Sequence, residues 1–260
     1  MSDLTTGTSV FTNESTRCIS VATYNIHRCK GRDGRRDPDR IVDVIREIDA
    51  DIIGLQELDF RHYPKGKSCR IDDILAGTGL NVVYGYTLPE SAGRYGNALL
   101  TSHRVLDVRR INLSVPGREP RGAMDVDLEI HGKVVQVIVT HLGLRAFERK
   151  HQINRLLEAL PKEQNRFVIV LGDFNEWTPR NHRVRSLCTH LGKCPTLRTF
   201  PSLYPVLALD RIWVRPVESI TDICVHDSPI ARIASDHLPL KATIVMPNGH
   251  QPHQLEGIVG

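Results

Sequence analysis

Runs of apolar residues, each about as long as one strand, recur along the chain and are separated by polar turns. Residues 166–173, RFVIVLGD, show the unbroken apolar run of a strand buried on both faces. The stretch His131-Gly132-Lys133 lies between two such runs and indicates a hairpin turn. The same pattern predicts strands at residues 18–26, 51–57, 80–86, 96–102, 104–113, 122–130, 133–141, 166–173, 208–215, 220–225 and 237–246.

Other segments have their apolar residues at helical spacing. In the first of them, Pro38 stands near the start, and Ile41, Val44, Ile45 and Ile48 form one apolar face. Proline suits the first turn of a helix, where a missing N–H costs no hydrogen bond. The predicted helices are residues 38–49, 71–77, 146–160 and 179–190.

The order of these elements predicts the fold class. Hairpin turns join some neighbouring strands and helices join others, which favours mixed sheets with the helices outside. A chain of 260 residues with this many strands is expected to stack two sheets, and its 40% hydrophobic content suffices for such a core. We expect a flexible arm at residues 1–17, one domain at residues 18–246 and a flexible tail at residues 247–260.

Composition says little about partners but bears on the compartment. The formal net charge of +4 neither excludes polyanions nor indicates a nucleic-acid-binding protein. No run of about 18 apolar residues predicts a membrane span, and the Ser/Thr-rich start lacks the basic and apolar parts of a signal peptide. We therefore expect a cytoplasmic monomer with its six cysteines reduced. Cys188, His190 and Cys194 are close enough in sequence to suggest zinc, but no fourth ligand is evident.

Polar residues continue the apolar face of several predicted strands. Side chains alternate along a strand, so Ile169, Leu171, Asp173 and Asn175 are expected on one face. Three other strands end in the same way, and two later ones carry their polar residues at the start. Because the end of one antiparallel strand lies beside the start of the next, these groups can meet at one edge. They are Asn25, Glu57, His141, Asp173, Asn175, Asp210, Asp236 and His237.

This set of side chains indicates a type of chemistry. Asp and Asn also follow strands simply as turn residues, and for any single strand that explanation is the stronger one. A pattern shared by six strands favours a site instead. Carboxylates, amides and histidines together suit a hard divalent cation and metal-assisted hydrolysis of a phosphoester. The chain has no GxxxxGKS/T, GxGxxG or GxSxG segment, which weighs against ATP-driven, dinucleotide and serine-hydrolase chemistry.

Seven motifs in these regions resemble, in order, those of the endonuclease/exonuclease/phosphatase superfamily. They are TYNIH, IIGLQELD, YGNALLTS, VTHLGL, VLGDFNEW, ALDRIWV and SDHLPL, and they cover the chain from about Cys18 to Val245. The superfamily includes pancreatic-type deoxyribonucleases, abasic-site endonucleases, neutral sphingomyelinases and inositol-polyphosphate 5-phosphatases. The resemblance implies its α+β fold, an α/β/β/α four-layered sandwich of two mixed sheets between helices. The compact length and TYNIH resemble small bacterial members of unassigned substrate.

The resemblance also implies roles around a metal ion. Glu57 is expected as the principal metal ligand, with Asn25 beside it to orient that carboxylate or the phosphate. Asp236 is expected on the metal side of the site or behind a histidine. Asp173 is expected to orient and deprotonate the attacking water, with Asn175 holding the phosphate or the nucleophile. The expected cofactor is one Mg²⁺ or Mn²⁺ ion.

The two histidines and four further residues are expected on the substrate side. His237 is expected to hydrogen-bond a non-bridging phosphate oxygen, with Asp210 keeping it cationic and in the right tautomer. His141 is expected to contact phosphate or assist the leaving group. Arg121 could bind phosphate bidentately or be an exposed strand-start arginine. His27 could touch phosphate or be a solvated strand end. Candidates for the substrate rim just after Asp173 are Trp177 and Arg180.

The expected activity is hydrolysis of phosphoester bonds in a phosphate-containing substrate, by a phosphodiesterase, nuclease or phosphatase. Aromatic residues make up only 5% of the chain and leave few platforms for stacking bases, so a general phosphoesterase is preferred over a DNA nuclease. A nuclease acting on DNA stays open as an alternative. A catalytically inactive phosphate-binding module is a further alternative, disfavoured because the polar set is intact.

Overall fold

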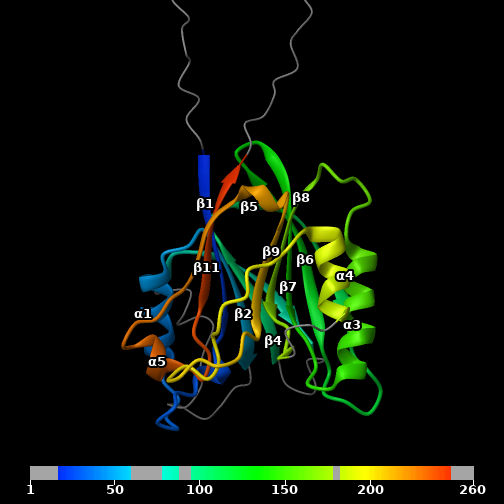
Figure 1. Ribbon diagram of the computed structural model, residues 1–260. Coiled ribbons are helices and arrows are strands. Elements are labelled where there is room, and N and C mark those ends of the chain that lie inside the picture. The colour runs from blue at the N-terminus through cyan, green and yellow to red at the C-terminus, as the bar shows by residue number, and fades with distance from the viewer. Residues whose placement is uncertain (1–16, 60–77, 88–94, 178–181, 247–260) are drawn as a thin grey trace, which may run out of the picture.

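Two β-sheets stacked face to face form the centre of the molecule (Figure 1). The structure is a computed structural model that describes residues 17–59, 78–87, 95–177 and 182–246. One sheet contains β1 (Arg17–Asn25), β2 (Ile52–Asp59), β3 (Asn81–Tyr86), β4 (Tyr95–Thr101), β10 (Ile220–Val225) and β11 (Leu240–Met246), in the order β10–β11–β1–β2–β4–β3. The other contains β5 (Arg104–Asn112), β6 (Gly122–Ile130), β7 (Lys133–His141), β8 (Phe167–Asp173) and β9 (Asp210–Arg215), in the order β5–β6–β7–β8–β9.

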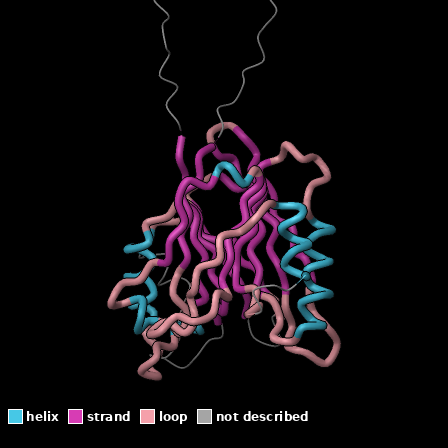
Figure 2. The backbone as a smooth tube through the Cα atoms, viewed as in Figure 1, coloured by secondary structure: helices cyan, strands magenta, loops and turns pink. Residues whose placement is uncertain are grey.

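Helices cover the outer faces of both sheets, as Figure 2 shows by the cyan segments on either side of the magenta strands. The helices α1 (Pro38–Ile48) and α5 (Ala231–Ala234) pack on the six-stranded sheet in one buried cluster. The helices α3 (Ala146–Ala159) and α4 (His182–Leu191) pack on the five-stranded sheet in another. Single 3-10 turns are η1 (His27–Cys29) and η3 (Val217–Ser219).

A third hydrophobic cluster fills the space between the sheets. Alternate residues of β1, β7 and β8 supply Val21, Val137 and Ile169, all fully buried. Gly54 of β2 also faces this space, since a Cβ there would lie 2.1 Å from Cδ1 of Leu171. Both sheets are mixed, because β1 pairs parallel with β2, and β7 with β8, among otherwise antiparallel pairs. The predicted α/β/β/α four-layered sandwich is therefore confirmed.

The element boundaries agree with the sequence pattern except at a few points. Each of the eleven predicted strands has a counterpart, and the largest difference is at the last, where β11 begins only at Leu240. Pro239 lacks the amide hydrogen that a ladder needs, so the strand starts after it. The short α5 has no counterpart among the predictions, because one turn carries no periodic pattern. The predicted helix at 71–77, residues 1–16 of the expected arm and the expected tail at 247–260 lie outside the described residues.

The crossover helices bring several strand ends to one edge. β1 leads through α1 to the parallel β2, and β7 leads through α3 to the parallel β8, so the carboxyl ends within each pair lie together. β9 runs antiparallel to β8 and therefore begins where β8 ends. The register places His141 beside Asp173 and Asp173 beside Asp210. Three predicted site residues thus lie in a row across one sheet.

One expectation about the cysteines is wrong. Cys29 is disulfide-bonded, whereas Cys18, Cys188, Cys194 and Cys224 are free. The expectation that all six cysteines are reduced therefore fails at Cys29. Within the described ranges, the suggested zinc ligands near Cys188 form no group able to hold a metal. No helix in the described part of the chain has the length and apolar character needed to cross a membrane.

Candidate active site

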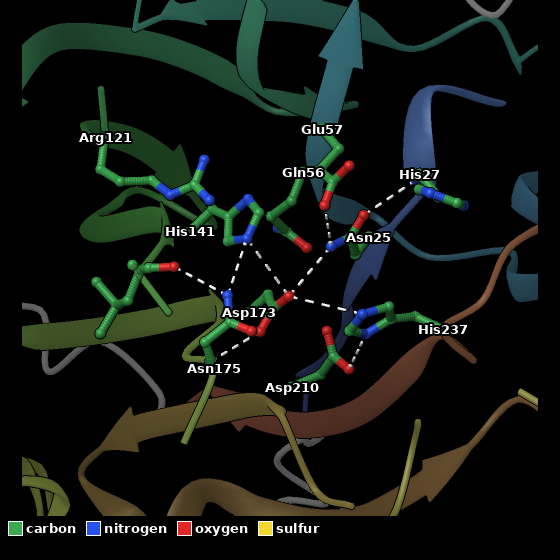
Figure 3. Close-up of polar contacts among 12 residues, drawn as sticks. Asn25, His27, Gln56, Glu57, Arg121, His141, Asp173, Asn175, Asp210 and His237 are labelled. Atoms are coloured by element: carbon green, nitrogen blue, oxygen red, sulfur yellow. Dashed lines mark hydrogen bonds and ion pairs between the residues drawn. The ribbon is translucent and has the colours of Figure 1, made fainter. Parts of the chain in front are cut away.

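The buried carboxylate of Asp173 is the centre of a hydrogen-bonded network between the two sheets (Figure 3). Nδ2 of Asn25 donates to Asp173 Oδ2 at 3.1 Å, and this contact joins the end of β1 to the end of β8. The backbone N–H of Asn175 donates to Asp173 Oδ1 at 2.8 Å. Asn175 has a φ of 48°, a left-handed conformation that asparagine tolerates, so the chain turns back toward the carboxylate it has just left.

His237 and Asp210 form a buried ion pair beside this carboxylate. Nδ1 of His237 lies 2.8 Å from Asp210 Oδ2, and its Nε2 lies 3.7 Å from Asp173 Oδ2. Burial by itself would lower the pKa of His237, but the negative charges of Asp210 and Asp173 raise it to about 10. Thr199 helps to hold the pair by donating its hydroxyl to the same oxygen, Asp210 Oδ2, at 2.5 Å. His237 is therefore an imidazolium at neutral pH, with Nε2–H directed toward Asp173.

The pKa of Asp173 is set by opposing influences. Burial raises it most, and the negative charge of Asp210 raises it further. The positive charge of His237 and the hydrogen bonds from Asn175 and Asn25 lower it, and the result is a pKa of about 6. Such a carboxyl is ionised at neutral pH, yet it is basic enough to accept a proton from a bound water.

His141 takes the opposite charge state from His237. Burial, followed by the positive charges of Arg121 and His237, lowers the pKa of His141 well below its ordinary value. Nδ2 of Asn175 lies 3.1 Å from His141 Nε2 and 2.9 Å from the carbonyl oxygen of Leu142. An amide nitrogen can only donate, so Nε2 accepts and the ring proton of the neutral His141 is on Nδ1. Two histidines at one edge thus hold different charges because their neighbours differ.

Glu57 reaches the site by a route that strict alternation does not predict. Ile53 and Leu55 belong to the cluster under α1, whereas the inward face of β2 carries Ile52, Gly54 and Gln56. Alternation would therefore turn Glu57 toward the helix layer, and the expectation that it shares the site face with Leu55 is wrong. A bulge between Leu55 and Leu58, with a φ of 60° at Glu57, redirects this side chain. Nδ2 of Asn25 then donates to Glu57 Oε1 at 3.2 Å.

The oxygen donors around Glu57 fit a hard divalent cation better than the more buried acidic group does. Asp173, Asp210 and His237 offer ligand atoms within 4.8 Å of one another. In this group, however, His237 Nδ1 and Asp210 Oδ2 are already hydrogen-bonded to each other at 2.8 Å. The half-buried Glu57 carboxylate has no lysine or arginine at ion-pair distance within the described ranges. A carboxylate of this kind suits Mg²⁺ or Mn²⁺.

The other two predicted metal residues occupy different positions around Glu57. Asn25 Nδ2 contacts both Glu57 and Asp173, while its Oδ1 accepts from the backbone N–H of His27 at 3.0 Å. Its polar atoms are thus engaged in orienting the two carboxylates. Asp236 is partly exposed and lies with Oδ1 3.6 Å from His27 Nδ1. The structure therefore brings Asn25 and Glu57 into contact and joins Asp236 to His27 at the edge of the site.

The predicted substrate-side residues differ in how closely they approach the site. Arg121 is only 7% exposed, extends toward His141 in Figure 3, and its Nε has no hydrogen-bond partner among the described residues. Its Nη1 pairs with the half-exposed Glu119 at 3.1 Å, a pair that solvent screens. Trp177 is 47% exposed and lies under the guanidinium of the buried Arg149, 5.1 Å from its ring centre. Arg180 lies outside the described residues.

Several residues that support the site carried no signal in the sequence. Thr199 reaches Asp210 from a loop with no periodic pattern, and Ser235 donates to the carbonyl oxygen of Asn25 at 2.7 Å. Arg28 lies with its guanidinium 5.0 Å from the centre of the Tyr95 ring. Burial and then the negative charge of Glu57 raise the pKa of the Tyr95 hydroxyl. These contacts depend on loops that meet only in the folded chain.

A buried carboxylate, an imidazolium, a neutral imidazole and a half-buried glutamate side by side suit hydrolysis at an anionic centre. Residues 22–237 match the profile of the Endonuclease/Exonuclease/phosphatase family, and the chain belongs to this family. A relative from Escherichia coli strain K12, described as "Uncharacterized protein YbhP", is 32% identical over 249 residues, which cover 87% of this chain and 96% of the relative.

Solved structures with the same fold have lower identity to the chain. The endonuclease/exonuclease/phosphatase from Bacteroides vulgatus has a TM-score of 0.72 at 19% identity, over 88% of this chain and 98% of that one. The Bacteroides thetaiotaomicron mannosyl-6-phosphatase has a TM-score of 0.69 at 18% identity, over 86% and 98% of the two chains. A humanized D. rerio TDP2 has a TM-score of 0.66 at 16% identity, over 87% and 98%. At such identities the likeness shows the fold alone.

Proposed function

We propose that the protein hydrolyses phosphoester bonds with the help of one divalent metal ion, Mg²⁺ or Mn²⁺. The observation that carries this proposal is the placement of Asp173, a buried base with a pKa of about 6, against the imidazolium of His237. Membership of a family of phosphoester hydrolases supports it. The Glu57 carboxylate, oriented by Asn25, is the proposed metal ligand.

The proposed mechanism places each group at the attacking water, the phosphate or the leaving group. Asp173 accepts a proton from the attacking water as the water oxygen bonds to phosphorus and the bond to the leaving-group oxygen breaks. The imidazolium of His237 donates from Nε2 to a non-bridging phosphate oxygen, and Asn175 helps to position the water or the phosphate. A cation bound at Glu57 would supply further positive charge at the phosphoryl oxygens. The neutral His141 offers its Nδ1–H, and Arg121 its free Nε–H, to the phosphate or the leaving group.

Two other functions follow from the same fold and are separated by experiment. A nuclease would use these groups on DNA, but the large exposed aromatic side chains of the described chain, on which bases could stack, are limited to Phe147, Trp177 and Tyr204. An inactive phosphate-binding module would not need a base with a pKa near 6. We therefore prefer a phosphodiesterase or phosphatase acting on a lipid head group or a small phosphoester.

A panel of substrates tests the proposal. Hydrolysis of bis-p-nitrophenyl phosphate, p-nitrophenyl phosphate and plasmid DNA should be measured with Mg²⁺, with Mn²⁺ and with EDTA. We expect metal-dependent hydrolysis that falls by about 10² to 10⁴ in Asp173→Asn. The matched control is Asp222→Asn, which removes an exposed carboxylate on β10 and should leave the rate unchanged. Absence of metal-dependent hydrolysis of every substrate would leave the inactive module as the better explanation.

A further inference from the structure

The exposed apolar side chains of this molecule are concentrated around the site. Nine large hydrophobic residues are exposed in the described part of the chain. Three of them lie on the β5 edge or at the β6–β7 hairpin, far from Asp173. The other six lie in loops, in the first turn of α3 or within α5, on the side of the molecule that carries the site. These six are Leu144, Phe147, Trp177, Tyr204, Val206 and Ile233.

Three of the six, which we call the α3 lip, lie in the loops after β7 and β8 and in the first turn of α3: Leu144, Phe147 and Trp177, which are 56%, 51% and 47% exposed. The buried guanidinium of Arg149 lies 5.1 Å from the Trp177 ring centre, and its Nη1 donates to the carbonyl oxygen of Leu144. The guanidinium of Arg118 lies 5.3 Å from the Phe147 ring centre. Leu144 and Trp177 follow directly on the ends of β7 and β8, which places this lip at the mouth of the site.

The remaining three form the α5 lip: Tyr204, Val206 and Ile233, which are 74%, 60% and 45% exposed. The loop that carries Tyr204 is attached to the site, because Ser202 N–H donates to the carbonyl oxygen of Asp236 at 2.8 Å. Ile233 belongs to α5, which ends just before Asp236. In Figure 1 this loop, α5 and the start of α3 lie at the same lower end of the molecule.

Basic side chains accompany both lips. The N–H of Arg32 donates to the carbonyl oxygen of Ile233 at 3.0 Å, so the loop after η1 lies against the α5 lip. The acids near these loops are ion-paired: Asp33 with Arg40, Glu119 with Arg121, Glu148 with Arg118 and Asp227 with Arg232. The exposed basic residues of these loops are Arg32, Arg35, Arg118, Arg145 and Lys150.

We propose that the α3 and α5 lips dock this end of the molecule on an anionic phospholipid surface. Aromatic and aliphatic side chains that alternate with arginine and lysine match the boundary between acyl chains and anionic head groups. A protein partner would be expected to cover one contiguous apolar patch, whereas here the exposed apolar residues form two separate groups, one after β7 and β8 and one around α5. Docking in this pose would bring head-group phosphates to Asp173 and His237, and that consequence rests on the proposed function.

The two tryptophans make the docking directly measurable. Trp213 is fully buried, whereas Trp177 is 47% exposed on the α3 lip. Emission from Trp177 should shift to shorter wavelength when the full-length protein binds vesicles of phosphatidylglycerol and phosphatidylcholine. The measurement is made in EDTA without turnover, so its outcome is independent of the phosphoesterase activity. Co-sedimentation with the same vesicles gives a second readout, and binding should weaken as salt is added.

Variants on the lips and a matched control decide the proposal. Phe147→Ser and Ile233→Ser should each weaken vesicle binding, by about tenfold when combined. Val134→Ser is the control, because Val134 is 47% exposed but lies about 23 Å along β7 from His141, at the far end of the strand. Thermal unfolding confirms that all three variants fold.

Several outcomes would overturn the proposal. These are an absence of vesicle binding at low salt, equal binding to pure phosphatidylcholine vesicles, or an equal loss in Val134→Ser. Self-association in sedimentation velocity that Phe147→Ser abolishes, without vesicle binding, would identify a second copy of the chain as the occupant instead. Selective loss of anionic-vesicle binding in the lip variants supports docking whether or not the protein hydrolyses any phosphoester.

Discussion

The charge of His237 depends on Asp210, and replacing that carboxylate by an amide of the same shape tests the dependence. Burial would lower the pKa of His237, but Asp210 and Asp173 raise it from the ordinary 6.5 to about 10. This difference corresponds to about 5 kcal/mol in favour of the imidazolium. Asp210 is the stronger of the two charges, and its Oδ2 lies 2.8 Å from His237 Nδ1. In Asp210→Asn the pKa of His237 should therefore move back toward 6.5 or below.

Activity and stability should both report this change. Because a neutral His237 donates more weakly to phosphate, kcat/KM at neutral pH should fall by about 10² to 10⁴. In the wild-type protein the fall of kcat/KM on the alkaline side should lie near pH 10, the pKa of His237. In Asp210→Asn it should lie several pH units lower. Because the pKa of His237 is higher in the folded than in the unfolded protein, the imidazolium stabilises the fold. This stabilisation is fully present below pH 6.5 and is lost as the pH rises through about 10.

The assay is the pH profile of kcat/KM for bis-p-nitrophenyl phosphate, together with an NMR titration of the His237 ring. His237→Asn assigns the ring signal, and Asp222→Asn on β10 controls for the loss of one exposed carboxylate. The ring titration needs no turnover, so it separates a lost charge from a general loss of activity. An unchanged alkaline limb and an unchanged ring pKa in Asp210→Asn would refute the reasoning.

Three further predictions concern Asp173, Glu57 and Gly54. Asp173→Asn should lose most of the activity. In the wild-type protein kcat/KM should fall as the pH drops below about 6, because Asp173 must be ionised to accept a proton; a wild-type rate that does not change across this pH would contradict it. EDTA should stop hydrolysis. Glu57→Gln should raise the Mg²⁺ concentration that gives the half-maximal rate by at least about tenfold. An unchanged Mg²⁺ titration would show that Glu57 is not a metal ligand. Gly54→Ala should lower the free energy of unfolding by about 1–3 kcal/mol, because the new Cβ would lie 2.1 Å from Leu171 Cδ1. Thermal unfolding measures this change, and an unchanged stability would show that the interface between the sheets can adjust.

The sequence predicts most of the fold because strand periodicity is a local property. Apolar alternation locates the strands, and the polar residues that follow Ile169 and Leu171 on the same face point to the site edge. The same reasoning fails at Glu57, where a bulge interrupts the alternation. The bulge depends on the positive φ of a single residue, Glu57, and the pattern of apolar and polar residues does not reveal a backbone angle. The residues near Thr199 and Arg28 fall outside any periodic element, so their contacts could not be predicted.

The sequence by itself determines which residues can carry the chemistry, since side-chain type and the face of a strand follow from position along the chain. Only the tertiary structure decides what each residue does. His141 and His237 are chemically identical, yet one is neutral beside Arg121 and the other is cationic beside Asp210. Charge state depends on burial and on neighbours within a few ångströms, and folding brings those neighbours together from distant parts of the chain.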